Sequence, residues 1–396
     1  MTTVTTAVHD AATEARRTVA ALPAAQQPTW RDEPARAQAL VALGAGHQIV
    51  SESEVTDLRA RLRAVADGRA VVLQAGDCAE PMTDTSTVVV EAKARAIDDM
   101  SAALAAAGSR PVIRIGRIGG QFGKPRSQTH EMIGGALVPT YRGPLVNDPF
   151  PSARAREHEP QRLLRARESA HTVTMALRRR AGNTVWTSHE ALVLDYELPQ
   201  LRLTSHDEVM LTSAHTIWIG ARTNQLDHAH VALASRIINP VGCKVSAGIS
   251  PSELLSLVEK LNPHRESGKL MLIARMGSGI DRLPALMEAV RREGHQPIWM
   301  SDPMHGNTTT AADGRKTRYI ESITEELRRF QDAARASDSK AGGVHLETTI
   351  DDVRECLANK HDLRDGHAPY TTLCDPRLTV AQAIEVLGHW QIGDRS

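Results

Sequence analysis

Residues 111–127 read Pro-Val-Ile-Arg-Ile-Gly-Arg-Ile-Gly-Gly-Gln-Phe-Gly-Lys-Pro-Arg-Ser, an apolar run that passes directly into a glycine-rich basic segment. The apolar part predicts a buried β-strand over Pro111–Ile118. The segment Gly116–Ser127 contains four glycines and three cations, and glycine lets backbone amides turn toward an anion. Its spacing matches neither common phosphate-binding fingerprint, so a solvated basic loop remains an alternative. We therefore predict a strand whose carboxyl end carries an anion-binding loop.

Seven further apolar runs of this kind recur along the chain, and amphipathic stretches separate them. The runs are continuous, as expected for parallel strands that are buried on both faces. Eight strands that alternate with helices predict a (β/α)8 barrel, with a doubly wound open sheet as the alternative. We expect a helical N-terminal extension over 1–66 and the barrel over 67–396. The seven other predicted strands are Ala70–Cys78, Thr184–Ser188, Thr216–Gly220, Gly242–Ser246, Leu270–Met276, Pro297–Ser301 and Gly343–Glu347, and the predicted helices include Val88–Ala107, Gln161–Arg180, Pro251–Leu261, Leu283–Arg292 and Tyr319–Ala336.

The bulk composition narrows the class of protein. The chain has 396 residues, of which 41% are hydrophobic, and Lys+Arg and Asp+Glu are equal at 47 each. This balance argues against a general binder of nucleic acid or of acidic membranes. No apolar run resembles a signal peptide or a membrane span, and four cysteines in so long a chain argue for a reducing compartment. We expect a cytoplasmic protein without a membrane or nucleic-acid partner.

Conspicuous polar residues follow the ends of the predicted strands, where barrels of this class carry their active sites. One subset mixes a thiol, an imidazole and two carboxylates. No pair in it has the local spacing of a metal motif, so a buried structural cysteine and a helix-capping glutamate remain alternatives. Taken together, these donors suit a borderline divalent ion better than Ca²⁺. The subset consists of Cys78, His305, Glu347 and Asp375.

A second subset is cationic. Six cations at one barrel mouth would repel each other strongly unless an anion filled the space between them. Independent surface charges are the alternative for any single arginine, but this explanation fits poorly for an arginine that follows the run Leu-Met-Leu-Ile-Ala. The expected ligand is a multiply charged anion or two phosphorylated molecules. The subset consists of Arg117, Lys124, Arg126, Arg222, Lys244 and Arg275.

From about Trp30 to the C-terminus, the chain resembles the type II (class II) 3-deoxy-D-arabino-heptulosonate 7-phosphate (DAHP) synthases. The resemblance implies a (β/α)8 barrel that condenses phosphoenolpyruvate with erythrose 4-phosphate and water to DAHP and phosphate, the first step of the shikimate pathway. It also implies a homo-oligomer (a dimer or a tetramer) and a divalent metal, with Mn²⁺ or Co²⁺ favoured over Fe²⁺, Zn²⁺ or Cd²⁺. The motifs are Gly-Asp-Cys-Ala-Glu (76–80), Gln-Phe-Gly-Lys-Pro-Arg-Ser (121–127), Thr-Ser-His-Glu-Ala-Leu (187–192), Trp-Ile-Gly-Ala-Arg-Thr (218–223), Asn-Pro-Val-Gly (239–242), Arg-Met-Gly (275–277), Asp-Pro-Met-His-Gly-Asn (302–307) and Cys-Asp-Pro-Arg (374–377).

The same resemblance implies roles for individual residues. It implies that Cys78, His305, Glu347 and Asp375 hold the metal. It places phosphoenolpyruvate against Arg117, Ala221, Arg222, Lys244 and Arg275, and erythrose 4-phosphate against Lys124, Pro125, Arg126, Ser127 and Asp302. The catalytic group comprises Lys124, Glu190, Lys244 and His305; we expect Lys124 to protonate the developing alkoxide and Glu190 to orient or deprotonate water.

Two departures from the family pattern bear on function. Most members have Glu where this chain has Ala221, and longer members insert a helical pair used for inhibition where this chain has a short connection between Arg178 and Thr184. We expect activity to survive the first departure and that inhibition to be lacking because of the second. Three other functions stay open: condensation with another phosphorylated aldose, a metal-dependent barrel hydrolase, and a non-enzymatic binding barrel.

Overall fold

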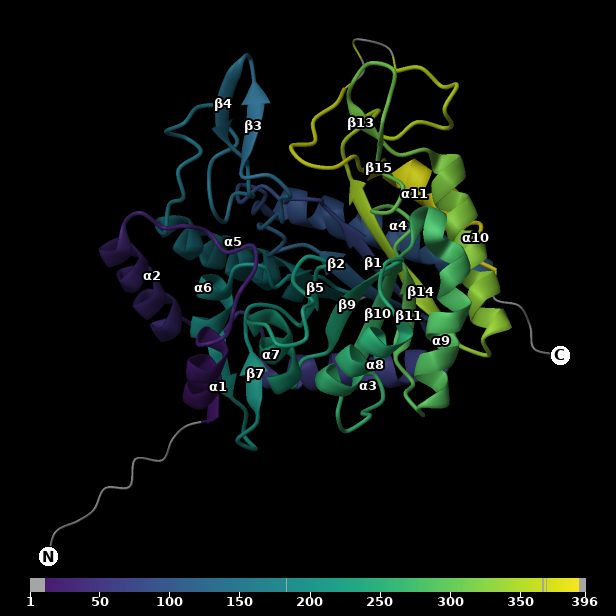
Figure 1. The fold of residues 1–396 in the computed structure, drawn as a ribbon, viewed down its shortest axis with the longest axis horizontal. Helices are drawn as coiled ribbons and strands as arrows, with labels where there is room; N and C mark the ends of the chain where they lie inside the picture. Colours follow the sequence, from purple (N-terminus) through teal and green to yellow (C-terminus); the bar gives the residue numbers. More distant parts are fainter. Residues whose placement is uncertain (1–10, 183, 365–366, 368, 392–396) are drawn as a thin grey trace, which may run out of the picture.

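The computed structural model describes residues 11–182, 184–364, 367 and 369–391, which form a parallel barrel surrounded by helices (Figure 1). The barrel strands pair in the order β1-β2-β5-β8-β9-β10-β11-β14, and β14 pairs back with β1, so this sheet closes on itself. Every pairing around the barrel is parallel, and all carboxyl ends therefore open at the same mouth. The predicted (β/α)8 barrel is confirmed, and the open-sheet alternative is wrong.

All eight predicted strands are present, with ends that differ by a few residues at most. The prediction succeeded because each strand is buried along nearly its whole length, which gives the continuous apolar runs of the sequence. The strands are β1 (Val71–Gly76), β2 (Val112–Arg117), β5 (Val185–Glu190), β8 (Thr216–Ile219), β9 (Val241–Ser246), β10 (Leu270–Arg275), β11 (Ile298–Ser301) and β14 (Ala341–Thr349).

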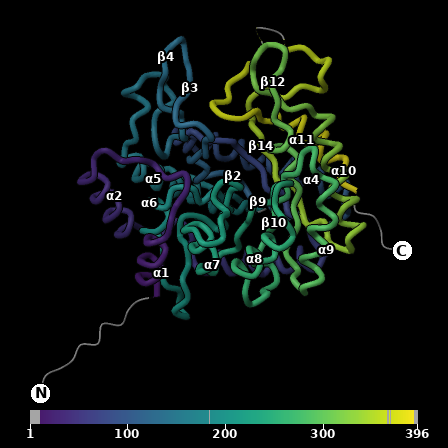
Figure 2. The backbone as a smooth tube through the Cα atoms, in the orientation of Figure 1, coloured from purple at the N-terminus to yellow at the C-terminus, as the bar shows by residue number. Residues whose placement is uncertain are grey.

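Helices cover the outside of the barrel, as the tube in Figure 2 shows. Helix α8 begins with a complete capping box, in which Ser250 accepts from the backbone of Glu253 and the Glu253 side chain accepts from the backbone of Ser250. The five predicted helices are confirmed as α4, α5, α8, α9 and α10. The helices are α4 (Thr87–Gly108), α5 (Gln161–Arg178), α6 (Leu194–Glu197), α7 (Ala229–Arg236), α8 (Pro251–Leu261), α9 (Leu283–Arg292), α10 (Ile320–Ala336) and α11 (Val380–Leu387), with short 3-10 turns η1 (Leu198–Gln200) and η2 (Gly277–Arg282).

Three helices precede β1 in the N-terminal part: α1 (Ala11–Ala20), α2 (Glu33–Ala45) and α3 (Glu52–Ala66). Leu58, Leu62 and Val65 of α3 join one buried cluster with interior barrel side chains such as Trp218 and Met300. Helix α3 therefore packs into the core at the amino ends of the strands. The predicted helical character of the extension is confirmed over 11–66, whereas residues 1–10 lie outside the described residues. The domain boundary at residue 66 remains a prediction.

Three hairpins and one short strand were not predicted. The hairpins β3–β4 and β12–β13 follow β2 and β11, so both rise from the mouth of the barrel, as Figure 1 shows. Gly134 and Gly135 at the tip of β3–β4 both adopt positive φ, which is the glycine pair that a tight hairpin requires. These elements are β3 (His130–Ile133), β4 (Ala136–Pro139), β6 (Leu201–Leu203), β7 (Val209–Leu211), β12 (Thr309–Thr310), β13 (Lys316–Thr317) and β15 (Leu378–Thr379).

A helix that spans a bilayer must be both long and apolar. Among the residues that the structure describes, none of the helices meets both requirements for a membrane span.

Candidate active site

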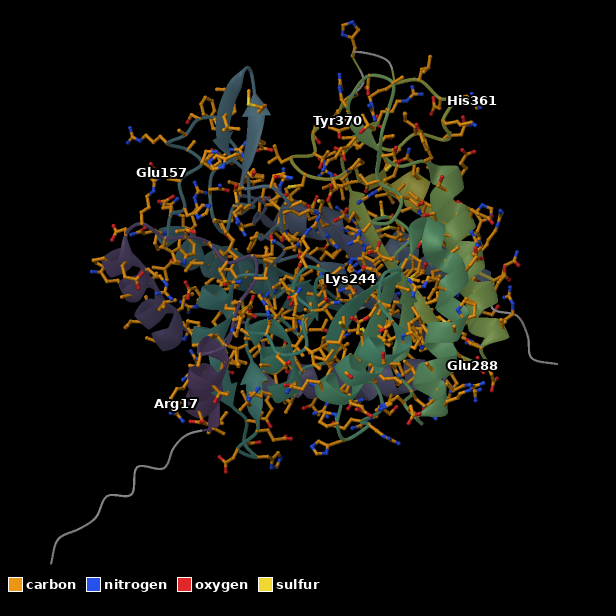
Figure 3. The ribbon with its side chains drawn as sticks, in the orientation of Figure 1. Arg17, Glu157, Lys244, Glu288, His361 and Tyr370 are labelled. Carbon is orange, nitrogen blue, oxygen red and sulfur yellow. The ribbon has the colours of Figure 1, made fainter. Side chains whose placement is uncertain are left out.

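A cavity of about 430 Å³ opens at the carboxyl ends of the barrel strands. All six cations of the predicted basic subset line it, and so do Glu190, His305, Glu347 and Asp375. In Figure 3, Lys244 lies near the middle of the molecule, whereas the labelled surface residues Arg17, Glu157 and Glu288 lie at its periphery. The structure therefore brings together residues from seven barrel segments that are far apart in sequence.

The loop after β2 owes its course to a buried carboxylate and to glycine. Glu80 accepts from the backbone N–H of Gly119 at 2.7 Å and of Gly120 at 3.2 Å. Gly119 has a φ of +71°, and a Cβ added at Gly120 would lie 2.5 Å from Nδ1 of His189. Only glycine therefore fits both positions, and the loop turns at once after the strand. This turn delivers Lys124 to the inner wall of the cavity.

Arg117 ends β2 with a buried, fully engaged guanidinium. It donates to the backbone oxygen of Asp77 at 2.9 Å, to Nε2 of His345 at 2.7 Å and to Oε1 of Glu347 at 2.9 Å. Because arginine only donates, Nε2 of His345 acts as the acceptor. Arg117 is thus held in one orientation before any ligand binds.

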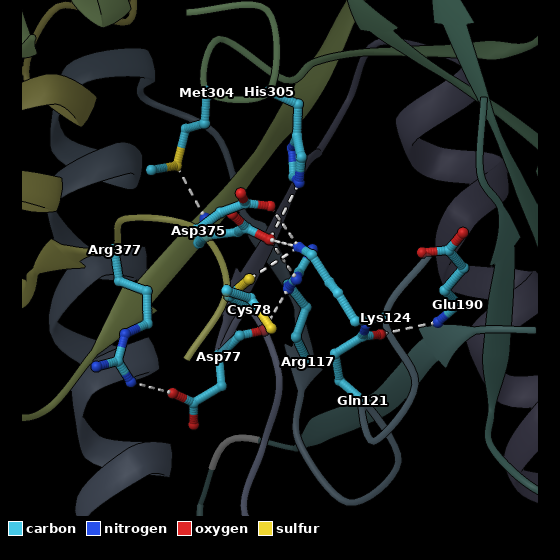
Figure 4. Close-up of polar contacts among 12 residues, drawn as sticks. Asp77, Cys78, Arg117, Gln121, Lys124, Glu190, Met304, His305, Asp375 and Arg377 are labelled. Carbon is cyan, nitrogen blue, oxygen red and sulfur yellow. Dashed lines mark hydrogen bonds and ion pairs between the residues drawn. The ribbon is translucent and has the colours of Figure 1, made fainter. Parts of the chain in front are cut away.

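One wall of the cavity, called here the acidic wall, gathers Cys78, Glu347 and Asp375. One donor atom from each lies within 4.8 Å of the other two. The ammonium of Lys124 stands among them, 2.8 Å from the Cys78 Sγ, 2.7 Å from an Asp375 oxygen and 3.4 Å from Glu347 Oε1. Figure 4 shows Cys78, Lys124, Asp375, Arg117 and His305 converging on this point. A cation is therefore already favoured at the centre of the predicted metal ligands.

His305 approaches the acidic wall from the loop after β11. Its Nε2 lies 3.0 Å from Glu347 Oε1, while its Nδ1 lies 2.8 Å from a carboxylate oxygen of Asp302. A carboxylate on one ring nitrogen orients an imidazole so that its other nitrogen can bind a metal. His305 thus reaches the acidic wall through Glu347, with Asp302 behind it.

The charges of the acidic wall fit a divalent ion. Burial opposes ionisation of Glu347, but His305, Lys124, Arg318 and Arg117 outweigh it and hold the pKa of that carboxyl well below its usual range. Burial, a hydrogen bond with Cys374 and the charge of Glu347 raise the pKa of the Cys78 thiol well above its usual value. Metal binding would therefore displace a proton from this sulfur. One sulfur, one nitrogen and two carboxylates suit a borderline metal.

A second part of the cavity lining, called here the basic wall, consists of Arg222, Lys244 and Arg275. Arg222 donates to Ser127 Oγ at 2.7 Å, and Arg275 donates to the backbone oxygen of His305 at 2.9 Å. Lys244 is paired with buried Asp302 at 2.5 Å. Burial lowers the pKa of Lys244 to about 8 against the attraction of Asp302. Within the part of the chain that the structure describes, Arg222 and Arg275 thus face the cavity with a hydroxyl and a backbone oxygen as partners, and neither is paired with a carboxylate.

Glu190 lies at the end of β5 and lines the cavity. Its backbone N–H donates to Gln121 at 2.9 Å, and its Oε1 is buried without a hydrogen-bond partner among the described residues. Burial raises the pKa of this carboxyl, although Lys124, Lys244 and His305 oppose the shift. A buried carboxyl with a raised pKa and a free oxygen is suited to general acid–base work.

Two predicted residues lie beneath the cavity surface and do not line it. Cys78 is buried but reaches the cavity through Lys124, and Asp302 is buried between Lys244 and His305. A role for Asp302 in binding erythrose 4-phosphate stays a prediction. Pro125, Arg126, Ser127 and Ala221 do line the cavity. Arg126 is also paired with Glu131 at 3.0 Å.

The predicted set lacks two cations that the structure places at the site: Lys316, which lines the cavity and is paired with Asp375 at 2.9 Å, and Arg318. Arg318 is fully buried, and its Nη1 donates to Glu347 Oε2 at 2.7 Å and to the backbone oxygen of Pro376 at 2.6 Å. It therefore connects the segments that carry Glu347 and Asp375. Arg318 directly follows the short strand β13 and belongs to no recognisable motif. Only the expectation that Glu347 needs a third cation could have pointed to it.

Comparison with known proteins agrees with this geometry. The chain matches the Class-II DAHP synthetase family over residues 14–184 and 172–389. It is 45% identical to a probable phospho-2-dehydro-3-deoxyheptonate aldolase of Pseudomonas fluorescens, with 93% of this chain and 94% of that protein covered. It is 37% identical to the phospho-2-dehydro-3-deoxyheptonate aldolase of Streptomyces coelicolor (92% and 94% covered) and 36% identical to that of Mycolicibacterium smegmatis (92% and 91%).

Members of this family differ in length. The alignment with the Mycolicibacterium smegmatis protein runs over 428 positions, more than the 396 residues of this chain, so that relative contains inserted residues. The two segments of the family match meet at 172–184, where the sequence predicts a shortened connection. The extent of the match and the identities establish that this chain belongs to the class-II DAHP synthase family.

Proposed function

We propose that the cavity at the barrel mouth is the site where phosphoenolpyruvate, erythrose 4-phosphate and water react. The reaction of this family yields DAHP and phosphate and is the first step of the shikimate pathway, and the chain is a transferase of this type. The observation that carries the assignment of the site is the meeting of six cations with His305, Glu347 and Asp375 in one cavity. Two phosphates and a carboxylate supply the anions that such a cavity needs.

Dependence on a divalent metal is general in this family. We assign the metal to Cys78, His305, Glu347 and Asp375. The donors of Cys78, Glu347 and Asp375 meet around the Lys124 ammonium, and Nε2 of His305 contacts Glu347. When bound, the ion supplies Lewis-acid polarisation of the aldehyde carbonyl. The mixed donors favour Mn²⁺ or Co²⁺, with Fe²⁺, Zn²⁺ and Cd²⁺ as further candidates.

The two substrates are assigned to different parts of the cavity. Arg117, Lys244 and Arg275 hold the carboxylate and phosphate of phosphoenolpyruvate, and Arg222 with the backbone at Ala221 lies beside them. The loop from Lys124 to Ser127 receives erythrose 4-phosphate. Fixing both molecules face to face lowers the barrier by removing the entropy cost of their encounter.

The chain's own groups then move the protons. The C3 carbon of phosphoenolpyruvate forms a bond to the aldehyde carbon, and the aldehyde oxygen takes a proton from Lys124. Water adds to the cationic C2 centre that remains, and Glu190 accepts its proton. The bond from C2 to the phosphate oxygen then breaks, the departing phosphate takes the proton of the C2 hydroxyl, and C2 keeps the keto oxygen. Lys124 suits this role because it contacts the acidic wall and lines the cavity.

An assay of phosphoenolpyruvate consumption tests the proposal. Erythrose 4-phosphate and alternative phosphorylated aldoses are offered with Mn²⁺ or Co²⁺, and again with EDTA. We expect metal-dependent DAHP formation with erythrose 4-phosphate. Consumption only with another aldose would correct the substrate, whereas release of phosphate from phosphoenolpyruvate without condensation would favour a hydrolase.

We also propose an oligomeric state and a cellular compartment. The family resemblance supports a homo-oligomer, a dimer or a tetramer, which light scattering on the purified protein would test. All four cysteines are free thiols, which supports a cytoplasmic, reducing compartment.

A further inference from the structure

Helix α10 carries a buried carboxylate that belongs to neither wall of the cavity. Glu326 is 4% exposed, and its Oε1 accepts from the backbone N–H of Met276 at 2.8 Å and of Gly277 at 3.0 Å. Its Oε2 accepts from Nδ2 of Asn307 at 2.5 Å. One side chain on the outer helical layer thus holds two different loops at the barrel mouth.

Those two loops carry residues of the site. Met276 and Gly277 directly follow Arg275 at the end of β10, and Asn307 lies two residues after His305. Arg275 itself donates to the backbone oxygen of His305 at 2.9 Å. The loops are also in close backbone contact, because a Cβ added at Gly277 would lie 2.6 Å from the Gly306 oxygen. A shift of either loop would therefore move both Arg275 and His305.

We propose that Glu326 is a positioning residue that fixes Arg275 for phosphoenolpyruvate and His305 for the metal as one unit. This inference rests on the proposed function for the roles of those two residues. Glu326 touches no reacting atom, because α10 lies outside the barrel and its carboxylate ends on backbone and amide donors.

The three donors explain why a carboxylate is required here. A glutamine at 326 has one oxygen, which can still serve the two backbone amides, but its amide nitrogen would then face the Asn307 nitrogen. The hydrogen bond between residue 326 and Asn307, called here the Asn307 arm, would be lost. Asn307 cannot turn its amide around to restore it without giving up the bond that it donates to the backbone oxygen of Pro303 at 2.8 Å. Burial raises the pKa of Glu326 to about 7, so assays are best run above that pH, where the carboxylate is mostly ionised.

The test compares E326Q with E325Q, a matched control at the exposed neighbour on the same helix. Isothermal titration calorimetry measures Mn²⁺ and phosphoenolpyruvate binding directly, and steady-state kinetics are run at saturating Mn²⁺. For E326Q we expect the Kd for Mn²⁺ and the KM for phosphoenolpyruvate each to rise about tenfold, with the KM for erythrose 4-phosphate unchanged within about twofold. E325Q should behave as the parent protein in all three.

A second variant, N307A, removes the same arm from the other side and leaves Glu326 itself in place. It also removes the Asn307 bond to Pro303 within the His305 loop. Because the two loops move as one unit, N307A should raise the Kd for Mn²⁺ and the KM for phosphoenolpyruvate in the same direction as E326Q, with the KM for erythrose 4-phosphate unchanged. The proposal is overturned if E326Q matches E325Q, or if E326Q weakens all three ligands equally together with a fall in thermal midpoint. N307A also keeps the test decisive if E326Q does not fold. Because calorimetry needs no turnover, failure of the proposed reaction would be visible separately, as absence of DAHP from the parent protein.

Discussion

The two walls of the cavity differ in how their charges are balanced within the protein. The carboxylates of the acidic wall are already met by cations: Glu347 contacts Arg117, Lys124 and Arg318, and Asp375 contacts Lys124. On the basic wall, Arg222 and Arg275 instead donate to a hydroxyl and to a backbone oxygen. The first wall is organised by the protein itself, whereas the second leaves positive charge for anionic substrates.

The contrast separates the interactions that the fold must complete from those that a ligand must complete. Buried charges without partners are costly, so the acidic wall needs its cations even before a metal binds. Arginines at a cavity surface are less costly to leave without a carboxylate, because water reaches them and bidentate anions can later replace that water. Substitutions on the two walls should therefore fail in different ways.

The largest effect is expected on the acidic wall. E347Q removes the charge that faces His305, Lys124 and two arginines, and it should reduce kcat by roughly a thousandfold or more because metal binding is lost. Metal content of the purified protein should fall in parallel. E385Q, at an exposed position of α11, is the control. Full activity of E347Q with bound metal would contradict the assignment of this wall.

The second-largest effect is expected on the basic wall. R275M should lower kcat/KM for phosphoenolpyruvate by about a hundredfold, since a charged hydrogen bond to a carboxylate or phosphate contributes about 1.5–3 kcal/mol, and the metal content should stay unchanged. R292M, which removes an exposed arginine paired with Glu288, is the control. If R275M lost metal and phosphoenolpyruvate affinity equally, the two walls would not be separable.

A smaller effect is expected on stability, from the lysine that stands in the acidic wall. K124M leaves the Cys78, Glu347 and Asp375 donors without the ammonium between them. The thermal midpoint of the EDTA-treated protein should fall by several degrees, and Mn²⁺ should restore most of the loss. K260M, at an exposed site on α8, should change neither value. Unchanged or higher stability in EDTA would show that Lys124 does not balance this wall.

The smallest effect concerns pH and Lys244. Burial lowers its pKa from 10.5 to about 8, so the burial cost of the ammonium is fully present below pH 8. Between the two values the folded protein has released the proton and the unfolded chain has not, so this group makes folding stability rise with pH there. Because we assign the Lys244 ammonium to phosphoenolpyruvate, loss of its proton should raise the KM for phosphoenolpyruvate severalfold above about pH 8.

The matched substitution for this prediction keeps the charge. K244R should hold the KM for phosphoenolpyruvate nearly constant over the same pH range, because arginine stays protonated. A parent protein whose KM does not change between about pH 7 and 9.5 would show that Lys244 does not titrate there or does not meet the substrate.

Much of the barrel could be predicted from local sequence. Runs such as Leu270–Arg275 are apolar along their whole length because parallel strands bury both faces, and this property is visible without any knowledge of partners. The hairpin β3–β4 was missed even though Gly134-Gly135 is a hairpin signal, because its strands are only four residues long and largely exposed.

The sequence predicted which residues form the site, but it did not predict which of their side chains contact each other. Residues such as Cys78, His305 and Glu347 follow strand ends in the sequence, which is enough to expect them at one mouth. That Lys124 stands among the acidic donors, or that Arg318 ties Glu347 to Pro376, depends on side-chain positions contributed by distant segments. Glu326 carries no signal in sequence, since a glutamate on an amphipathic helix is ordinarily exposed.

Local sequence was enough to predict the barrel, the basic loop over Gly116–Ser127 and the residues that gather at the mouth, because the burial of each strand is visible in its own residues. The pairing of the charges could be known only from the folded chain. Arg117, Lys124 and Arg318 converge on Glu347 because β2, its loop and the β13–α10 junction come together around the end of β14. Such pairing depends on distances of a few ångströms between segments separated by up to 230 residues, and no local pattern fixes those distances.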